Sequence, residues 1–298
     1  MMMRCFLLSL LLVVASLLVA TGTEAANRTD LVLATPDGAR HALVFAIGKG
    51  RHPTVIVLHG RNATAAEIAA GTGFVEAAAA HGFTAVFPDG LDEAWHDGRF
   101  PDDARPDDVG FLKSLVARLV ADGTAAPGHI YLAGISNGGM MAFTMACKAE
   151  KLFAGFATII AAMPAPLADC TIGPMPLVMI NGTADPVMPF AGGAVGLAGH
   201  PHGRVIGVEQ TALRFVRADG CKVRRTKALP DRVKSDGTSV TRVAWTGCRQ
   251  HDSVSLYRIE GGGHEIPGHP SADTPNYGLS NLDISAADTI LAAFANGK

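Results

Sequence analysis

The pentapeptide Gly134-Ile135-Ser136-Asn137-Gly138 constrains this chain more than any other feature of its sequence. The apolar run at residues 129–133 before it is typical of a buried strand, and residues 137–149 after it predict a helix. A serine flanked by glycines between a strand and a helix is typical of a nucleophile elbow, whose sharp turn needs small neighbours. The motif therefore predicts that Ser136 is a catalytic nucleophile at the end of a strand.

Short apolar runs alternate with longer helical patterns along much of the chain. Strands are predicted at residues 54–58, 83–87, 129–133, 156–161 and 176–180, and helices at residues 63–80, 106–120, 137–149 and 285–295. This alternation predicts an α/β protein with a mainly parallel central sheet flanked by helices. Together with the nucleophile elbow, it indicates the α/β-hydrolase fold.

Strand-like runs also occur outside this pattern, at residues 30–34, 41–47, 223–229, 239–245 and 253–259. The first two predict an antiparallel edge of the sheet. The last three predict a small added β-hairpin near residues 221–248, followed by the last strand of the main sheet. Residues 191–203 are rich in glycine and histidine and predict a loop. With no repeat and no Pro/Ser-rich linker, we expect a single catalytic domain over residues 27–298.

Residues 1–26 have the pattern of a secretory signal peptide. A short basic start ending at Arg4 precedes an apolar run at residues 6–20, and Thr23-Glu24-Ala25 offers small residues for cleavage. The alternative is a transmembrane anchor, but the apolar run is shorter than the ~20 residues that a span needs. We expect an extracellular or periplasmic protein with no stable membrane anchor after cleavage.

Cleavage there would leave four cysteines in an oxidising compartment, and an even number favours disulfides. Four cysteines allow three pairings, among which the sequence alone does not choose, and four free thiols are the alternative. We favour Cys147 with Cys170 and Cys221 with Cys248, because each pair brackets one plausible supersecondary unit. No pair has CxxC spacing, so a thiolate metal site is not expected.

The charge balance bears on the partners of the chain. The net charge is −2, which gives no electrostatic reason to expect nucleic acid or an anionic membrane as partner. His200 and His202 are the candidate metal ligands, but neither a carboxylate nor a cysteine lies near them in sequence. We therefore expect neither a metal nor another cofactor.

A serine hydroxyl is a weak nucleophile and needs a base that an acid orients. In the α/β-hydrolase fold the acid and then the histidine follow the serine along the chain. Asp185 lies in a Gly-containing loop after the strand at 176–180 and is the candidate acid, with Asp169 as its rival. His264 follows three glycines after the last strand and is the candidate base, with His269 as the alternative.

Catalysis of acyl transfer also needs an oxyanion hole of two backbone N–H donors. The residue after the nucleophile, Asn137, is expected to supply one of them. The second is expected from the loop that follows His59-Gly60, where Arg61 is the candidate and Asn62 the alternative.

Seven segments resemble, in order, the polyhydroxybutyrate depolymerase and feruloyl esterase branch of the α/β-hydrolases. They are residues 58–60, 87–90, 95–99, 107–111, 134–141, 181–189 and 261–268, and they span most of residues 27–298. The resemblance implies a serine carboxylic ester hydrolase that acts through an acyl-enzyme, and it implies the same triad. It also supports both favoured cysteine pairings.

Two departures from the family pattern fall where the acyl group is expected to bind. Ile266 stands where the family often has a tryptophan, and Arg61-Asn62-Ala63 replaces a Gly- or Cys-rich loop. Substrate preference is therefore not carried over from the family. Trp95 is a further candidate for the pocket lining, and a core aromatic is the alternative.

The expected partner is a small-molecule or oligomeric ester. The sequence carries no linker followed by a polymer-docking module, which favours small esters or short hydroxyalkanoate oligomers over a crystalline polymer. Two alternatives stay open at this point. One is a serine peptidase on the same triad, and the other is a non-catalytic carbohydrate- or lipid-binding protein on a hydrolase scaffold.

Overall fold

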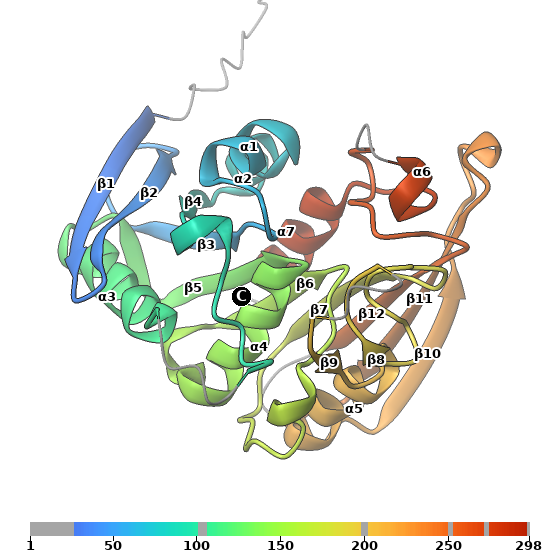
Figure 1. Ribbon diagram of the computed structural model, residues 1–298. Coiled ribbons are helices and arrows are strands. Elements are labelled where there is room, and N and C mark those ends of the chain that lie inside the picture. Colours follow the sequence, from blue (N-terminus) through green and yellow to red (C-terminus); the bar gives the residue numbers. More distant parts are fainter. Residues whose placement is uncertain (1–26, 101–105, 198–201, 250–252, 271–273, 297–298) are drawn as a thin grey trace, which may run out of the picture.

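The computed structural model describes residues 27–296 apart from residues 101–105, 198–201, 250–252 and 271–273, and one large sheet runs through its centre (Figure 1). The expected signal peptide at residues 1–26 lies outside the described residues. The strands of the sheet are β1 (Asn27–Thr35), β2 (Gly38–Ala46), β3 (His52–Leu58), β4 (Thr84–Pro88), β5 (Ala125–Ile135), β6 (Gly155–Ile159), β7 (Leu177–Gly182), β10 (Val223–Ala228), β11 (Ser239–Thr246) and β12 (Val254–Glu260).

In the described part of the chain these ten strands follow the order β1-β2-β4-β3-β5-β6-β7-β12-β11-β10. The central strands from β4 to β12 pair in parallel, and the strands at both margins pair antiparallel. Strands β8 (Gly193–Ala194) and β9 (Arg204–Val205) form a separate small sheet. The predicted parallel sheet and its antiparallel edge are therefore confirmed.

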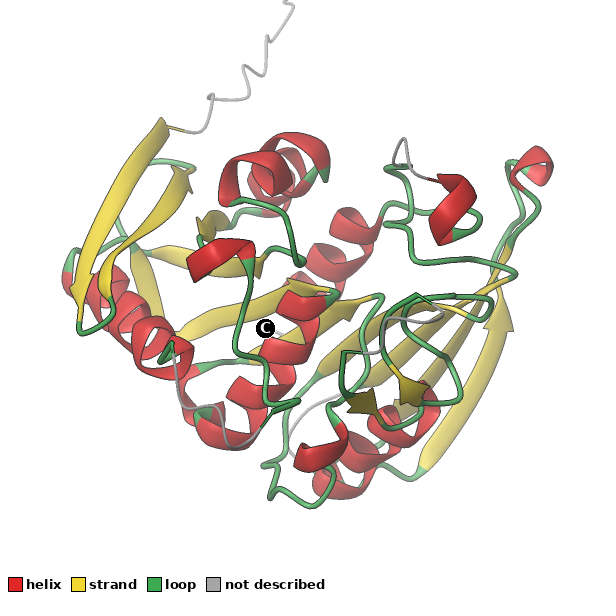
Figure 2. Cartoon of the chain, in the orientation of Figure 1, coloured by secondary structure: helices red, strands yellow, loops and turns green. Residues whose placement is uncertain are grey.

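Helices cover both faces of the sheet (Figure 2). One face packs against α3 (Asp108–Ala121), α4 (Asn137–Lys148) and α5 (Val208–Asp219), and the other against α1 (Ala65–Gly71), α2 (Phe74–His81) and α7 (Ala286–Asn296). Strand β3 shows why its sequence is apolar throughout. Val55 and Val57 belong to the core under α7, whereas Ile56 and Leu58 belong to the core under α4.

The single helix predicted at residues 63–80 is wrong. The structure divides this segment into α1 and α2, which are separated at Thr72 and Gly73. Gly73 has φ of 69°, a left-handed conformation that a helix interior does not contain. A Cβ on Gly73 would lie 2.7 Å from Nε2 of His269, so this break also lets a distant loop approach the chain closely.

The loop predicted at residues 191–203 is only partly correct. Residues 193–194 form β8, which pairs with β9 directly after the predicted loop. Residues 198–201 lie outside the described residues. The Gly- and His-rich composition did not reveal that this segment folds back on itself as a short antiparallel ribbon.

The added hairpin near residues 221–248 is present as β10 and β11, and it extends the main sheet beside β12. A disulfide joins Cys221, just before β10, to Cys248, just after β11. A second disulfide joins Cys147 of α4 to Cys170, in the segment between β6 and β7. Both favoured pairings therefore occur in the structure. No helix among the described residues is both long and apolar enough to cross a membrane.

Candidate active site

Ser136 lies on the turn between β5 and α4, with φ of 51° and ψ of −113°. A non-glycine residue rarely adopts positive φ, and the surrounding contacts must hold it there. The Ser136 N–H donates to the Ile159 carbonyl at 2.9 Å, and the Ser136 carbonyl accepts from the Met140 N–H at 3.0 Å. The backbone is thus anchored both to the neighbouring strand β6 and to the first turn of α4.

The two glycines of the motif are explained by how closely α4 approaches the sheet. A Cβ on Gly138 would lie 2.4 Å from the His59 carbonyl oxygen and 2.5 Å from that of Leu58. A Cβ on Gly134 would lie 2.2 Å from the Gly138 carbonyl oxygen. Real Cβ atoms do not approach backbone oxygens this closely, so any larger residue would force the turn apart.

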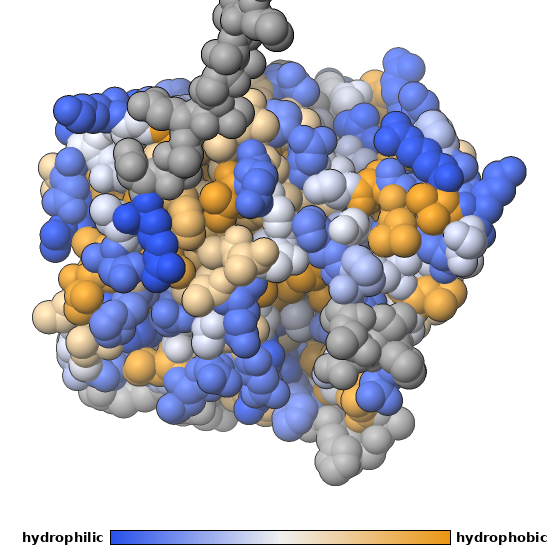
Figure 3. Space-filling model, turned by 90° about the horizontal axis from the view of Figure 1, so that it is seen from above, coloured by the Kyte–Doolittle hydropathy of each residue, from blue (hydrophilic) through white to orange (hydrophobic). Residues whose placement is uncertain are grey.

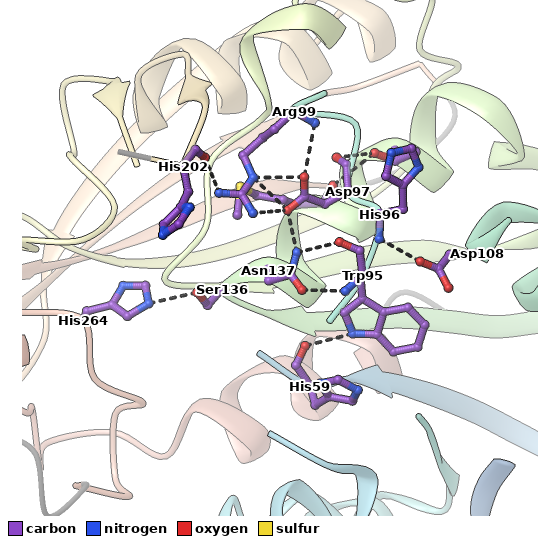
Figure 4. Close-up of polar contacts among 12 residues, drawn as sticks. His59, Trp95, His96, Asp97, Arg99, Asp108, Ser136, Asn137, His202 and His264 are labelled. Atoms are coloured by element: carbon purple, nitrogen blue, oxygen red, sulfur yellow. Dashed lines mark hydrogen bonds and ion pairs between the residues drawn. The ribbon is translucent and has the colours of Figure 1, made fainter. Parts of the chain in front are cut away.

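Ser136, His264 and Asp185 form a hydrogen-bonded chain. Nε2 of His264 lies 2.9 Å from Oγ of Ser136, a contact drawn in Figure 4, and Nδ1 of His264 lies 2.8 Å from Oδ2 of Asp185. The other carboxylate oxygen of Asp185 accepts the backbone N–H groups of Val187 and Met188 at 2.8 and 2.7 Å. The Asp185 side chain is 1% exposed, so these contacts fix the face that it presents to His264.

The loops that carry the acid and the histidine contact each other through glycines. The Ala184 N–H donates to the Gly262 carbonyl at 2.9 Å. A Cβ on Gly182 would lie 2.3 Å from the Gly262 carbonyl oxygen, and one on Gly263 would lie 2.0 Å from that of Tyr277. The glycine run before His264 is therefore needed for close packing of three loops. The rival acid Asp169 is exposed in a turn, and the structure does not bring it into this chain.

Two backbone N–H groups beside Ser136 are available as oxyanion donors. Those of Arg61 and Asn137 have no hydrogen-bond partner among the described residues. The alternative donor, Asn62, already donates its N–H to the Glu93 carbonyl at 2.8 Å. The loop that carries Arg61 lies against Ser136, since a Cβ on Gly60 would be 3.6 Å from Cβ of Ser136.

His59 holds the Arg61 loop in place. Its Nδ1 donates to the Gly60 carbonyl at 2.7 Å, and its Nε2 accepts the Gly90 N–H at 2.8 Å. Both contacts are satisfied only by the neutral ring with its proton on Nδ1. Burial lowers the pKa of His59 below its usual 6.5, and the nearby Asp89 carboxylate only partly opposes this.

A cavity of about 470 Å³ opens beside Ser136 and His264. Its aliphatic lining consists of Ala63, Ile68, Ile135, Ile160, Val187, Leu197 and Ile266, and its polar and aromatic lining includes Arg61, His202, Glu265, His269 and Tyr277. The volume suits a small-molecule ligand. Ile266 lines this cavity, and its contact with substrate stays a prediction. On the face shown in Figure 3, apolar residues lie in separate patches among hydrophilic ones.

Trp95 does not line the pocket, and the expectation that it does is corrected. The residue is 4% exposed and belongs to the hydrophobic core. Its indole N–H donates to the His59 carbonyl at 3.0 Å, and its ring stacks on Phe111 at 6.5 Å between centroids. The indole thus supports the end of β3, from which the chain continues to Arg61. Trp95 is therefore a core aromatic, which was the alternative.

Among the described residues, the structure adds no candidate metal site near the pocket. Among the described residues, the group close enough to hold an ion is Asp219 with Cys221 and Cys248, and these two cysteines are joined as a disulfide. His200 lies outside the described residues, and His202 lines the pocket. The absence of a metal therefore stays a prediction.

Sequence reasoning missed several residues at the site. Tyr277 lines the pocket and accepts the His264 N–H at 2.6 Å through its carbonyl, yet no pattern in the sequence marks it. Asp97 contacts Asn137, and Arg99 contacts His202. Both come from a loop that is far from their partners in the sequence. Asp97 and Arg99 lie in residues 95–99, one of the segments that resemble the esterase family, and this resemblance was the signal that could have identified them.

The fold and the site together define an α/β-hydrolase with the arrangement of a serine hydrolase. Residues 40–217 match the family described as "Esterase PHB depolymerase", and the chain belongs to this family of carboxylic ester hydrolases. A protein of Nocardia uniformis subsp. tsuyamanensis named "Putative esterase NocK" is 33% identical over 266 residues, which cover 85% of this chain and 76% of that protein.

Two further similarities agree with this family. Feruloyl esterase D of Neurospora crassa is 29% identical over 182 residues, which cover 60% of this chain and 52% of that protein, so the match spans about half of its length. The solved structure of acetyl xylan esterase from Aspergillus awamori has a TM-score of 0.60 at 11% identity, covering 89% of this chain and 98% of that one. This likeness shows the shared fold.

Gly138→Ala tests the close packing at the turn. The added Cβ must displace the Leu58 and His59 carbonyls, so we expect the free energy of unfolding to fall by about 1–3 kcal/mol and kcat/KM on an ester to fall at least about tenfold. Gly71→Ala at the end of α1 is the control, because its Cβ would meet nothing within 4 Å. Wild-type melting and activity for Gly138→Ala would contradict the account of the turn.

The neutral state of His59 predicts how stability depends on pH. Because its pKa is lower in the folded than in the unfolded state, the unfolded chain binds the extra proton first as the pH falls below 6.5. The contribution of His59 to the free energy of unfolding is therefore complete above pH 6.5 and is lost as the pH falls from 6.5 through the lower pKa of the folded state. Denaturant titrations at several pH values measure it. His59→Gln, which keeps an acceptor but does not titrate, should have a shallower dependence, and an equal slope would contradict the assignment.

Proposed function

We propose that this chain hydrolyses carboxylic esters through an acyl-enzyme formed on Ser136. The observation that carries the proposal is the chain of hydrogen bonds from Asp185 through His264 to Ser136 at the edge of a 470 Å³ cavity. A serine hydroxyl in this setting has a base within reach of its proton and space in front of it for an acyl group.

In the proposed first step, Oγ of Ser136 forms a bond to the ester carbonyl carbon while Nε2 of His264 takes the hydroxyl proton. The N–H groups of Arg61 and Asn137 would hold the oxygen on which negative charge develops. Asp185 keeps His264 oriented and stabilises its charged form. When the tetrahedral intermediate collapses, the bond to the alcohol oxygen breaks and His264 gives its proton to the leaving alcohol.

In the second step, His264 takes a proton from water while the water oxygen attacks the acyl carbon. Collapse of this second intermediate breaks the bond to Oγ and returns the proton to Ser136. The acid product leaves and the free enzyme is regenerated. The reaction balances as ester plus water giving acid plus alcohol, and the protein groups return to their starting state.

The lining of the cavity favours an aliphatic acyl group. Seven aliphatic side chains, among them Ile160 and Ile266, face a space sized for a small ligand. We therefore propose small esters or short hydroxyalkanoate oligomers as substrates, and we propose that aromatic acyl groups of the feruloyl kind are poorer ones. Nucleic acid is not among the proposed partners.

We also propose that the chain acts outside the cytoplasm as one catalytic domain over residues 27–298. The two disulfides, Cys147–Cys170 and Cys221–Cys248, support an oxidising compartment, extracellular or periplasmic. The signal-peptide pattern of residues 1–26 supports the same location.

Hydrolysis of a p-nitrophenyl ester series from acetate to octanoate, beside methyl ferulate, tests the proposal. We expect wild-type turnover that peaks within the aliphatic series, and a loss of about three orders of magnitude or more in kcat for Ser136→Ala. Ser114→Ala, on an exposed turn of α3, is the matched control and should match the wild type. Ser136→Ala activity within about tenfold of the wild type would reject the nucleophile. Cleavage of peptides without cleavage of esters would favour a peptidase, and binding without turnover of either would favour a binding protein.

A further inference from the structure

A buried carboxylate holds the side chain of the residue that follows the nucleophile. Asn137 Nδ2 donates to Asp97 Oδ2 at 2.5 Å and to the Trp95 carbonyl at 2.9 Å, and Asn137 Oδ1 accepts the Trp95 N–H at 2.7 Å (Figure 4). Asn137 is 2% exposed, so water does not compete for these contacts. Both the oxygen and the nitrogen of the side-chain amide are therefore held, and these contacts restrain the backbone that carries the Asn137 N–H.

Asp97 is in turn held by Arg99. Nε of Arg99 donates to both carboxylate oxygens at 3.0 and 2.9 Å, Nη2 lies 2.8 Å from Oδ2, and the Arg99 backbone N–H donates to Oδ1 at 3.1 Å. The side chains are 2% and 4% exposed. A planar guanidinium that contacts a carboxylate through several bonds defines its orientation as well as its charge. Arg99 therefore fixes the position of the Asp97 oxygen that accepts the Asn137 hydrogen bond.

The same guanidinium reaches a wall of the pocket. Nη1 of Arg99 donates to the His202 carbonyl, and a Cβ on Gly203 would lie 3.0 Å from Cβ of Arg99, so the aliphatic stem packs against this segment. His202 lines the cavity. The buried Asp97–Arg99 pair thus contacts both Asn137, beside Ser136, and the segment that borders the cavity. Figure 4 shows these contacts.

We propose that Asp97 and Arg99 are positioning residues for ester hydrolysis. Asp97 acts through Asn137 and sets the backbone N–H that receives the oxyanion. Arg99 keeps Asp97 in place and also sets the His202 wall. The inference rests on the proposed function, because the oxyanion role of Asn137 belongs to it. Neither side chain contacts the reacting atoms.

These roles predict different kinetic signatures. An oxyanion donor interacts more strongly with the transition state than with the substrate, so its displacement lowers kcat and leaves KM nearly unchanged. A displaced pocket wall weakens binding of substrate and transition state together, so it raises KM. A loss of folded protein also lowers the apparent kcat at unchanged KM, so each kcat is referred to the concentration of active sites titrated with a fluorophosphonate.

A double-mutant cycle on Asp97 and Asn137 is the test. In turnover of p-nitrophenyl butyrate, Asp97→Asn and Asn137→Ala should each lower kcat by about 10- to 100-fold, with KM within about threefold of the wild type. The kcat of the double variant should be within about twofold of that of the slower single variant, because both changes remove the same hydrogen bond between Asp97 and Asn137. Arg99→Lys keeps the charge beside Asp97 but not the reach to His202, so its KM should rise about fivefold or more while kcat changes less than threefold.

Asp108→Asn is the matched control. Asp108 forms an equally buried ion pair with Arg40, at 2.7 Å with both side chains 1% exposed. Its other carboxylate oxygen accepts the His96 N–H at 2.7 Å, so Asp108 contacts the same loop as Asp97 but does not contact Asn137. We expect it to lower the melting temperature and to leave kcat within about twofold of the wild type at temperatures where it is folded. A kcat loss in this variant equal to that of Asp97→Asn would show a general packing effect and overturn the proposal.

The remaining outcomes decide the proposal as well. It is overturned if Asn137→Ala keeps kcat within about threefold of the wild type, or if the two single effects multiply in the double variant. Asn137→Ala leaves the Asp97–Arg99 pair intact, so it decides the question even if Asp97→Asn fails to fold. Ester turnover that Ser136→Ala abolishes, together with normal kcat in Asp97→Asn and Asn137→Ala, rejects this inference alone. Absence of wild-type ester turnover would instead reject the proposed function.

Discussion

At the C-terminal edge of the parallel strands, neighbouring backbone segments pack so closely that only glycine fits at the points of contact. Gly138 of α4 lies against the last carbonyl groups of the β3 segment, and Gly182 at the end of β7 lies against those of Gly262 and Gly263 after β12. These contacts bring the turn that carries Ser136 and the loops that carry Asp185 and His264 to one edge of the sheet. The short hydrogen bonds of the triad depend on this approach, since a shift of about 1 Å would separate nucleophile and base.

Buried polar side chains hold the loops around the site in place. His59 is neutral and braces the Arg61 loop, and Trp95 braces the same strand end through its indole N–H. Buried ion pairs then connect this region to its surroundings, Arg40 with Asp108 on one side and Arg99 with Asp97 on the other. Pairs of this kind add little net stability, but they are strongly destabilising when one partner is lost. At this site the Arg99–Asp97 pair holds the Asn137 side chain, which we propose keeps the Asn137 backbone N–H in place before substrate binds.

Local patterns predicted much of the site, and distant contacts escaped them. Ser136 was identifiable because the motif and its flanking strand and helix occupy one continuous segment, and the order of acid and histidine follows from the fold. The break at Gly73 was missed because alanine-rich helical composition continues through it. Trp95 was misplaced because composition does not tell a core indole from one that lines a cavity. The bond from Arg99 to His202 spans 103 positions, and no periodicity or spacing rule can indicate such a contact.

The most direct test of the central claim, that Ser136 becomes acylated with His264 as its base, is site mapping after reaction with a small fluorophosphonate. Mass spectrometry of the digested protein should show one stable phosphonyl adduct, on the peptide that contains Ser136, and the labelling rate should fall by about two orders of magnitude or more in His264→Ala. An adduct on a different residue, or no adduct from a protein that still turns over esters, would contradict the account.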